Sequence, residues 1–356
     1  DGGARVSLPA SRAGREPLSE VAERLRAAIV DKLLGVEGSP IAARPPEVIP
    51  KLILATDGEM NLLPFEALPM PNGRYLLDHY EISYLGTGRD LLRRQGTSGV
   101  AAGEAVVIAD PAFELAGAGS VAGESRSGLR GELEAEHISF PPLPGTRLEG
   151  ERIATRLGVA AWMAEEALDS RLKGIRNPRI LHAATHGYFL SDQQAMDAQI
   201  RQWIGGATGM PDRLAGAGQQ NPMLRSGLAL AGCENWRRQE PLSAEAEDGL
   251  LMASDVAGMD LRGTEMVVLS ACETGMGELR HGEGVFGLRR GFLLAGAKTL
   301  VMSLWRVDDL ATVLLMDKFY EQVLPGKKSR SEALREAQRY LRREVTIGSI
   351  RSEWLN

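Results

Sequence analysis

The chain contains only two cysteines in 356 residues, Cys233 and Cys272. One possible pair is too little for a disulfide framework, which excludes the small disulfide-stapled secreted domains. The chain also lacks a basic segment followed by an apolar stretch, the mark of a signal peptide, and no apolar run reaches the roughly 18 residues of a membrane helix. We therefore expect a soluble protein of the reducing cytoplasm, with no membrane partner.

A strong charge of either sign is also missing. The chain has 41 Lys and Arg against 47 Asp and Glu, a net charge of -6. The short basic pairs Arg93-Arg94 and Arg289-Arg290 are typical of solvated helix faces, so nucleic-acid binding is not indicated. With 44% hydrophobic and 25% charged residues, the composition is that of a globular protein large enough for a sizeable core.

An initiating methionine is absent as well, and the Gly-, Ala-, Arg- and Pro-rich opening from Asp1 is typical of a piece of a longer protein. Apolar residues at helical spacing follow Ser19, a candidate cap, and predict a first helix that ends by Gly35. We assign residues 1–48 to an N-terminal helical and linker segment.

The next segment, 49–113, carries strand patterns at 51–55, 81–85 and 105–109, and we interpret it as an N-terminal α/β lobe. Residues 114–143 are rich in Gly, Ala, Ser and Glu and end in prolines. Such a composition buries little apolar surface, so we expect a flexible linker there.

Residues 144–356 alternate between strand and helix patterns, which predicts a mostly parallel sheet flanked by helices. A capping box at Thr146–Glu149 is expected to open a helix that ends near Leu157. Further strands are predicted at 159–163, 179–184, 226–231, 265–270 and 297–303, and helices at 166–173, 249–256, 283–294, 308–323 and 330–344. Two inserts, 191–220 and 240–248, are expected to leave from the edge where specificity loops lie.

Cys272 and His186 each end an apolar run and are followed by glycine, at Gly275 and Gly187. Parallel strands would carry both groups to one edge of the sheet. Because a thiol of pKa about 8.5 is only a few per cent ionised at neutral pH, a neighbouring imidazole is needed to activate it. The pattern predicts a nucleophile and its base, with the amides of Gly187 and Cys272 as the oxyanion hole.

Other candidate groups have plainer interpretations. Cys233 ends an apolar run without a second histidine strand, so we interpret it as a buried small hydrophobe. His182 lies four strand positions before His186, about 13 Å away, which is too far for both to bind one zinc ion. We expect no metal, and a core or supporting role for His182. Glu273 would raise the pKa of the thiol if it pointed inward, so we expect it to face away.

Several ordered motifs resemble the CHAT family of caspase- and separase-like cysteine peptidases of clan CD, over about residues 50–325. They are Leu63–Leu68, Leu143–Arg147, Thr185–Gly187, Ser226–Gly232, Leu269–Gly275, Gly282–Gly284, Leu294–Ala297 and Ser303–Asp309. The resemblance implies an α/β caspase-hemoglobinase fold with an N-terminal pseudo-caspase-like lobe, a His-Cys dyad and no cofactor. In many relatives such a domain follows helical repeats that sense a signal, so a sensor or repeat region of a parent protein is an expected partner.

The resemblance to separase extends to substrate selection. Separase has a similar Leu-Trp strand end followed by an acidic residue that receives a basic P1 side chain. Asp309 matches that position better than Asp308, and either aspartate can instead cap the helix that begins there. Trp305 would supply a hydrophobic wall. Arg306 departs from the acidic residue of the separase pattern.

We therefore expect a cysteine endopeptidase that cleaves one or a few proteins after a basic residue through an acyl-thioester on Cys272. The glycines of the 274–283 turn would allow a signal to control it, with the thiol held away from the imidazole until activation. Two alternatives stay open: a catalytically silent CHAT-like signalling scaffold, and a cysteine-dependent hydrolase of small amides, which would need a closed pocket.

Overall fold

A computed structural model of the chain describes residues 18–34, 49–56, 60–61, 63–93, 99–116, 120–121, 126–135, 137–190, 222–273, 283–304, 307–324, 326 and 328–345. The insert expected at 191–220, residues 274–282 of the glycine turn, and Trp305 lie outside this part. No helix in the described part is long and apolar enough to cross a bilayer.

In the described part, the fold is built on a seven-stranded sheet, which is mostly parallel as predicted. Its parallel strands lie in the order β11 (Leu300–Met302), β10 (Met266–Glu273), β6 (Ile180–Phe189), β3 (Val106–Pro111) and β5 (Ala161–Ala164). Two antiparallel strands complete this sheet. Strand β7 (Ser226–Ala229) pairs with the last residues of β6, and β9 (Leu250–Met252) pairs with β7. The long strand β6 is therefore central and supplies partners for three others.

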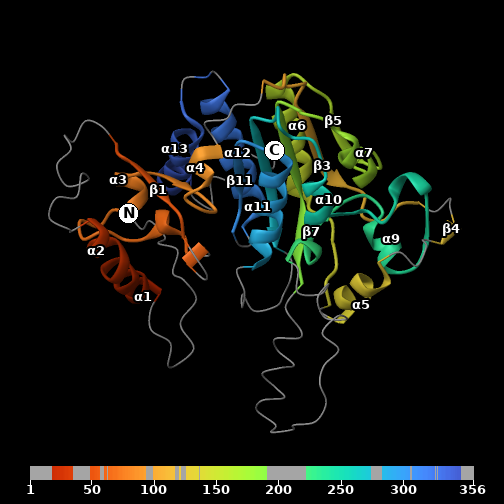
Figure 1. Ribbon diagram of the computed structural model, residues 1–356, viewed down its shortest axis with the longest axis horizontal. Coiled ribbons are helices and arrows are strands. Elements are labelled where there is room, and N and C mark those ends of the chain that lie inside the picture. Colours follow the sequence, from red (N-terminus) through yellow and green to blue (C-terminus); the bar gives the residue numbers. More distant parts are fainter. Residues whose placement is uncertain are drawn as a thin grey trace, which may run out of the picture.

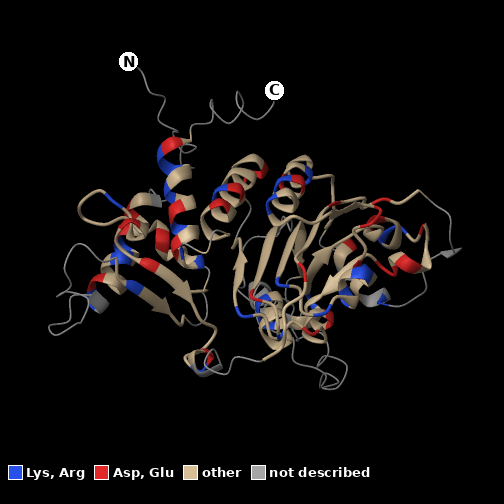
Figure 2. Ribbon diagram, turned by 90° about the horizontal axis from the view of Figure 1, so that it is seen from above, with Lys and Arg blue, Asp and Glu red and all other residues tan. Residues whose placement is uncertain are grey.

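Helices cover both faces of this sheet, which gives the three layers seen in Figures 1 and 2. One face carries α6 (Pro144–Leu157), α12 (Asp309–Val323) and α13 (Arg330–Glu344), and the other carries α7 (Asp169–Gly174), α10 (Ala253–Ala257) and α11 (Glu283–Ala295). Phe319 and Tyr320 fill the first interface, and Phe292 and Leu228 fill the second. This α/β/α arrangement is consistent with a caspase-like fold.

The helix expected over 249–256 begins as a strand instead. Residues Leu250–Met252 form β9, and only Ala253–Ala257 are helical. All three strand residues are buried, and β7 offers them a hydrogen-bonding edge. A three-residue apolar run has no period that distinguishes strand from helix, so tertiary pairing decides the outcome.

The N-terminal lobe is smaller than the sequence suggested. Among the residues described there, its sheet has two parallel strands, β1 (Lys51–Leu54) and β2 (Glu81–Tyr84). The accompanying helices are α1 (Leu18–Leu25), α2 (Asp31–Leu34), α3 (Leu76–His79) and α4 (Asp90–Arg93), with a π-helical turn at Arg26–Val30. The strand expected at 105–109 belongs to the large sheet as β3, because Val107, Ile108 and Ala109 are buried on both faces.

Much of the stretch expected to be a flexible linker, 114–143, is packed in the described part. Helix α5 (Ser127–Ala135) buries Leu129 and Leu133, and the segment after it buries Ile138 and Phe140. These side chains join one hydrophobic cluster with Trp236 of α9 (Cys233–Arg237). The average composition of this stretch is polar, so its few well-spaced apolar residues were not recognised as core residues. The short strands β4 (Ser120–Val121) and β8 (Pro241–Leu242) pair beside this cluster.

Helix α6 also starts differently from the expectation. It begins at Pro144 with Leu143 at the N-cap, so no capping box forms at Thr146–Glu149. The Thr146 hydroxyl donates to the Leu143 carbonyl at 2.7 Å, and Glu149 is buried against the sheet. A proline in the first turn already supplies a helix start. The predicted end at Leu157 is confirmed.

Charged groups join the N-terminal lobe to α13. Arg335 donates to the carbonyls of Leu77 and Asp78 at 2.7 and 3.0 Å. The Asp78 carboxylate, 1% exposed, pairs with Arg342 at 2.8 Å and with Arg343 at 3.3 Å. Burial would raise the pKa of Asp78, but the hydrogen bond and charge of Arg342 hold it below its usual range. The carboxylate therefore stabilises the docked lobe as an anion.

Replacing Asp78 with asparagine is expected to lower the free energy of unfolding by about 1 to 3 kcal/mol at pH 7, as for hydrogen bonds to charged groups. Because the folded pKa is depressed, this contribution is complete above the unfolded pKa of about 3.9 and disappears as pH falls through the lower folded value. Urea denaturation from pH 7 to pH 3 measures it. The matched variant Asp31→Asn, whose pair with Arg26 is more exposed, should change stability by less than about 1 kcal/mol. An Asp78→Asn effect that stays constant with pH would contradict this account.

Candidate active site

The register of β6 and β10 places the two predicted catalytic residues at paired positions. His186 is the Cα partner of Cys272, and Gly187 is the partner of Glu273. Neighbouring strands lie about 4.8 Å apart, and paired positions of parallel strands share a face of the sheet. The side chains of Cys272 and Glu273 lie outside the described part, so the expected orientation of Glu273 stays a prediction.

The His186 ring is held on several sides. It is 1% exposed, and its centroid lies 5.1 Å from that of Phe113 and 5.9 Å from that of Phe140. Its Nε2 atom lies 2.6 Å from the carbonyl oxygen of Pro141. A carbonyl only accepts hydrogen bonds, so Nε2 is the donor and the neutral ring keeps its basic lone pair on Nδ1. The ring is thus fixed as a tautomer with a defined basic atom.

Pro141, Phe113 and Phe140 were not among the residues we predicted for the site. Two of them come from the stretch expected to be a flexible linker. One signal was present in the sequence: Phe140 stands directly before Pro141-Pro142, a large aromatic side chain and a rigid backbone at the end of a polar stretch.

Gly187 follows His186 near the end of β6 and is paired with Leu228 of β7 on the other edge. Its backbone is therefore fixed between two strands, one position beyond the imidazole. The expected roles of the Gly187 and Cys272 amides as an oxyanion hole stay predictions.

A buried polar network lies on the same sheet face as the paired positions, nearer the middle of the strands. Glu149 Oε1 lies 3.1 Å from His182 Nε2, and its Oε2 accepts a hydrogen bond from Ser270 at 2.9 Å. His182 Nδ1 lies 3.2 Å from the Tyr320 hydroxyl. His182 is thus a core histidine, as expected. In the described ranges, no three His, Cys, Asp or Glu side chains are grouped to hold a metal ion.

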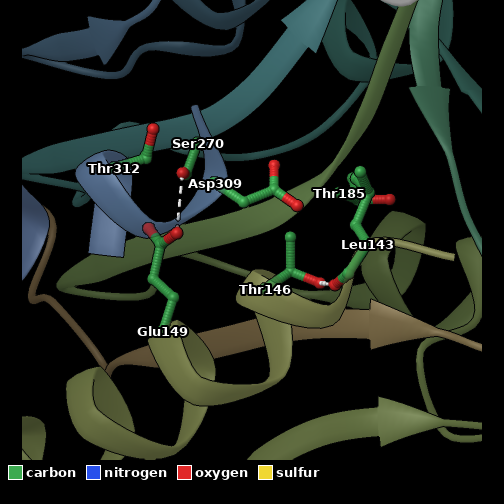
Figure 3. Close-up of a pocket in the computed structure, with 7 residues that line it drawn as sticks. All are labelled: Leu143, Thr146, Glu149, Thr185, Ser270, Asp309 and Thr312. Carbon is green, nitrogen blue, oxygen red and sulfur yellow. Dashed lines mark hydrogen bonds between the residues drawn. The ribbon is translucent and has the colours of Figure 1, made fainter. Parts of the chain in front are cut away.

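The start of α12 separates the roles of the two candidate S1 aspartates. Asp308 caps the helix, because its Oδ1 accepts from the Ala311 amide at 2.9 Å. Asp309 lines a small cavity between the first turns of α6 and α12 (Figure 3). The other lining residues are Leu143, Thr146, Glu149, Thr185, Ser270 and Thr312. The cavity holds about 20 Å³, room for about one water molecule.

Gly145 permits the close approach of these two helix starts. A Cβ atom at this position would lie 2.7 Å from the Cβ atom of Asp309. Gly145→Ala is therefore expected to push the helices apart and to lower the free energy of unfolding by about 1 to 3 kcal/mol, the usual cost of overpacking. Thermal or urea unfolding measures this change.

The control is Gly131→Ala in α5, where an added Cβ meets nothing within 4 Å. This variant should be neutral or slightly stabilising, by up to about 1 kcal/mol. Equal destabilisation by both variants would show that the contact at Asp309 is not the cause.

The second cysteine, Cys233, is a free thiol buried in the cluster around Trp236. Burial, followed by the charge of Glu234, raises the pKa of this thiol well above its ordinary value. The Cys233 thiol is therefore protonated at neutral pH and is not an activated nucleophile. This agrees with its interpretation as a small core hydrophobe.

Comparison with known proteins agrees with the class that the α/β fold indicates, a caspase-like fold. The CHAT domain family matches residues 16–347, and the chain belongs to this family. It is 25% identical to human (Homo sapiens) tetratricopeptide repeat protein 28 over 304 residues, which is 81% of this chain and 11% of that protein. The mouse (Mus musculus) protein of the same name is 37% identical over 89 residues, 25% of this chain and 4% of that protein. The chain spans about a tenth or less of the length of these relatives.

Proposed function

We propose that the chain is a cysteine endopeptidase with Cys272 as nucleophile and His186 as acid and base. The observation that carries this proposal is the pairing of His186 with Cys272 across β6 and β10, with the His186 Nε2 proton held by the Pro141 carbonyl. This pairing supports the proposal because thiol activation requires an imidazole with a basic nitrogen within reach of the thiol.

In the proposed reaction, His186 Nδ1 accepts the proton of the Cys272 thiol, and the sulfur attacks the scissile carbonyl carbon. The amides of Gly187 and Cys272 stabilise the oxyanion of the tetrahedral intermediate. His186 then donates its proton to the leaving amine, which leaves an acyl-thioester. Water activated by His186 attacks this thioester, releases the acid product and restores the thiol.

We further propose that cleavage follows a basic P1 residue and that Asp309 receives its side chain. The support is that Asp308 caps α12, whereas Asp309 lines the cavity between α6 and α12 together with Glu149. The cavity has room for about one water, so an arginine side chain enters only if it widens. A cavity that must widen before the substrate binds is consistent with the proposed activation by a signal. Trp305, outside the described part, keeps its proposed role as a pocket wall.

The proposed setting is the cytoplasm, and the proposed partners are a protein substrate and a helical-repeat sensor in the same parent protein. The family membership and the name of the tetratricopeptide repeat relatives support a repeat partner. Neither nucleic acid nor a membrane is part of the proposal.

A panel of fluorogenic peptides that differ only at P1 tests this function. The proposal predicts hydrolysis after Arg and Lys that iodoacetamide abolishes. Hydrolysis of small amides alone would favour an amide hydrolase. If no peptide is hydrolysed either by the chain alone or in the presence of the repeat region proposed as its partner, the signalling scaffold would be favoured.

A further inference from the structure

Helix α9 joins the two segments that flank the His186 ring. The Phe140 amide donates to the Glu234 carboxylate at 2.9 Å, and the Glu234 amide donates to the Phe113 carbonyl at 3.0 Å. Phe113 and Phe140 are the residues whose rings contact His186. We propose that Glu234 is a positioning residue for the catalytic imidazole, an inference that rests on the proposed function.

The connection from Glu234 to the imidazole is short. Glu234 fixes Phe140, and the next residue, Pro141, accepts the hydrogen bond from His186 Nε2 at 2.6 Å. Pro141 fixes its own φ and restricts Phe140, and Pro142 restricts the ψ of Pro141, so anchoring the Phe140 amide also limits the direction of the Pro141 carbonyl. A single side chain thereby controls both the stacking and the hydrogen bond of the ring.

Glu234 is itself rigidly held. It is 2% exposed, and its carboxylate accepts from Arg237 Nη2 at 2.6 Å and lies 3.3 Å from Arg238 Nε. The neighbouring Asn235 exchanges two hydrogen bonds with the Leu115 backbone, at 2.7 and 3.0 Å. Helix α9 is therefore anchored on both sides, and a buried charge with paired cations is a firm support for the Phe140 amide.

Loss of this support has a specific chemical consequence. If the Pro141 carbonyl moves away, Nε2 loses the acceptor that keeps the proton there, and the neutral ring redistributes its proton between Nε2 and Nδ1. A ring protonated on Nδ1 cannot accept the thiol proton. The result is a lower turnover number with little change in substrate binding, since Glu234 is not part of the proposed S1 cavity.

The test uses Glu234→Ala, Glu234→Asp and Glu234→Gln in the full chain. Three readouts are measured: kcat and KM on an Arg peptide, the rate of Cys272 alkylation by iodoacetamide, and the His186 tautomer from nitrogen NMR shifts. Asp248→Asn is the matched control, because Asp248 is also a buried carboxylate, paired with Arg126.

Glu234→Ala is expected to lower kcat and the alkylation rate by roughly 10- to 100-fold, as for a catalytic group displaced by about 1 Å. Its KM should change little, and the Nε2-protonated signal should weaken. Glu234→Gln keeps an oxygen acceptor, so its kcat and alkylation rate should stay within about threefold of those of the parent. If Glu234→Ala does not fold, Glu234→Asp should show the lower kcat and alkylation rate instead. Asp248→Asn should lower stability without changing the tautomer.

Parent-like alkylation and tautomer in Glu234→Ala, or in Glu234→Asp where alanine does not fold, would overturn the positioning role. The alkylation and NMR readouts need no peptide turnover. If the parent cleaves no Arg peptide but Glu234→Ala still slows Cys272 alkylation and shifts the tautomer, the positioning role holds and the peptidase assignment fails.

Discussion

Cys272→Ala and His186→Ala are each expected to lower peptide hydrolysis by at least about 10⁴-fold, because a nucleophile and its base act as one unit. The double variant should lose little more than either single variant. Initial rates on an Arg fluorogenic peptide measure the loss. His186→Ala removes a buried ring but leaves the pairing of β6 with β10 and β3 in place, so the variant should keep a cooperative unfolding transition, which circular dichroism monitors.

The matched control is Cys233→Ala, which removes the other thiol. Since Cys233 is buried and its pKa is raised, this variant should keep most activity and lose only core packing. Turnover by Cys272→Ala comparable to that of the parent would refute the assignment of the nucleophile and would strengthen the scaffold alternative.

The second large effect is expected at Asp309. Asp309→Asn should reduce kcat/KM for Arg substrates by about 2 to 4 kcal/mol in transition-state free energy, with little loss for Met or Leu at P1. A carboxylate left without its cationic partner is costly, and a planar guanidinium pairs with it better than an ammonium does. The parent should therefore also prefer Arg to Lys. The same peptide panel provides the measurement.

Asp308→Asn separates pocket charge from helix capping. Asp308 accepts the Ala311 amide, so its loss should cost about 1 kcal/mol of stability and affect all substrates alike. An unchanged Arg preference in Asp309→Asn, or a parent that prefers Asp at P1, would show that other residues build the S1 pocket.

The strands that carry the site were predictable because their sequence pattern is local. The apolar runs that end at His186 and Cys272 are long enough to identify central parallel strands, and the structure pairs those two positions. Helix α12 was equally clear, and of the two aspartates considered as caps, Asp308 caps it while Asp309 lines a cavity.

The support of the imidazole was not predictable in the same way. His186 Nε2 bonds a backbone carbonyl 45 positions away, and a carbonyl leaves no trace in residue type. Glu234 lies in a helix of only five residues, too short for a visible period. Its partner Phe140 follows a stretch whose composition suggested a linker. Contacts between short segments that are distant in sequence form only when the core is assembled, so local sequence patterns do not predict them.

The most direct test of the dyad is covalent labelling with a peptidyl-arginine chloromethyl ketone, followed by mass spectrometry of the modified peptide. One adduct is expected, on Cys272, and its formation should slow by at least about 10-fold in His186→Ala because the thiol then lacks its base. The buried Cys233 should remain unmodified. An adduct on Cys233, or labelling of Cys272 at the same rate in the parent and in His186→Ala, would contradict the account.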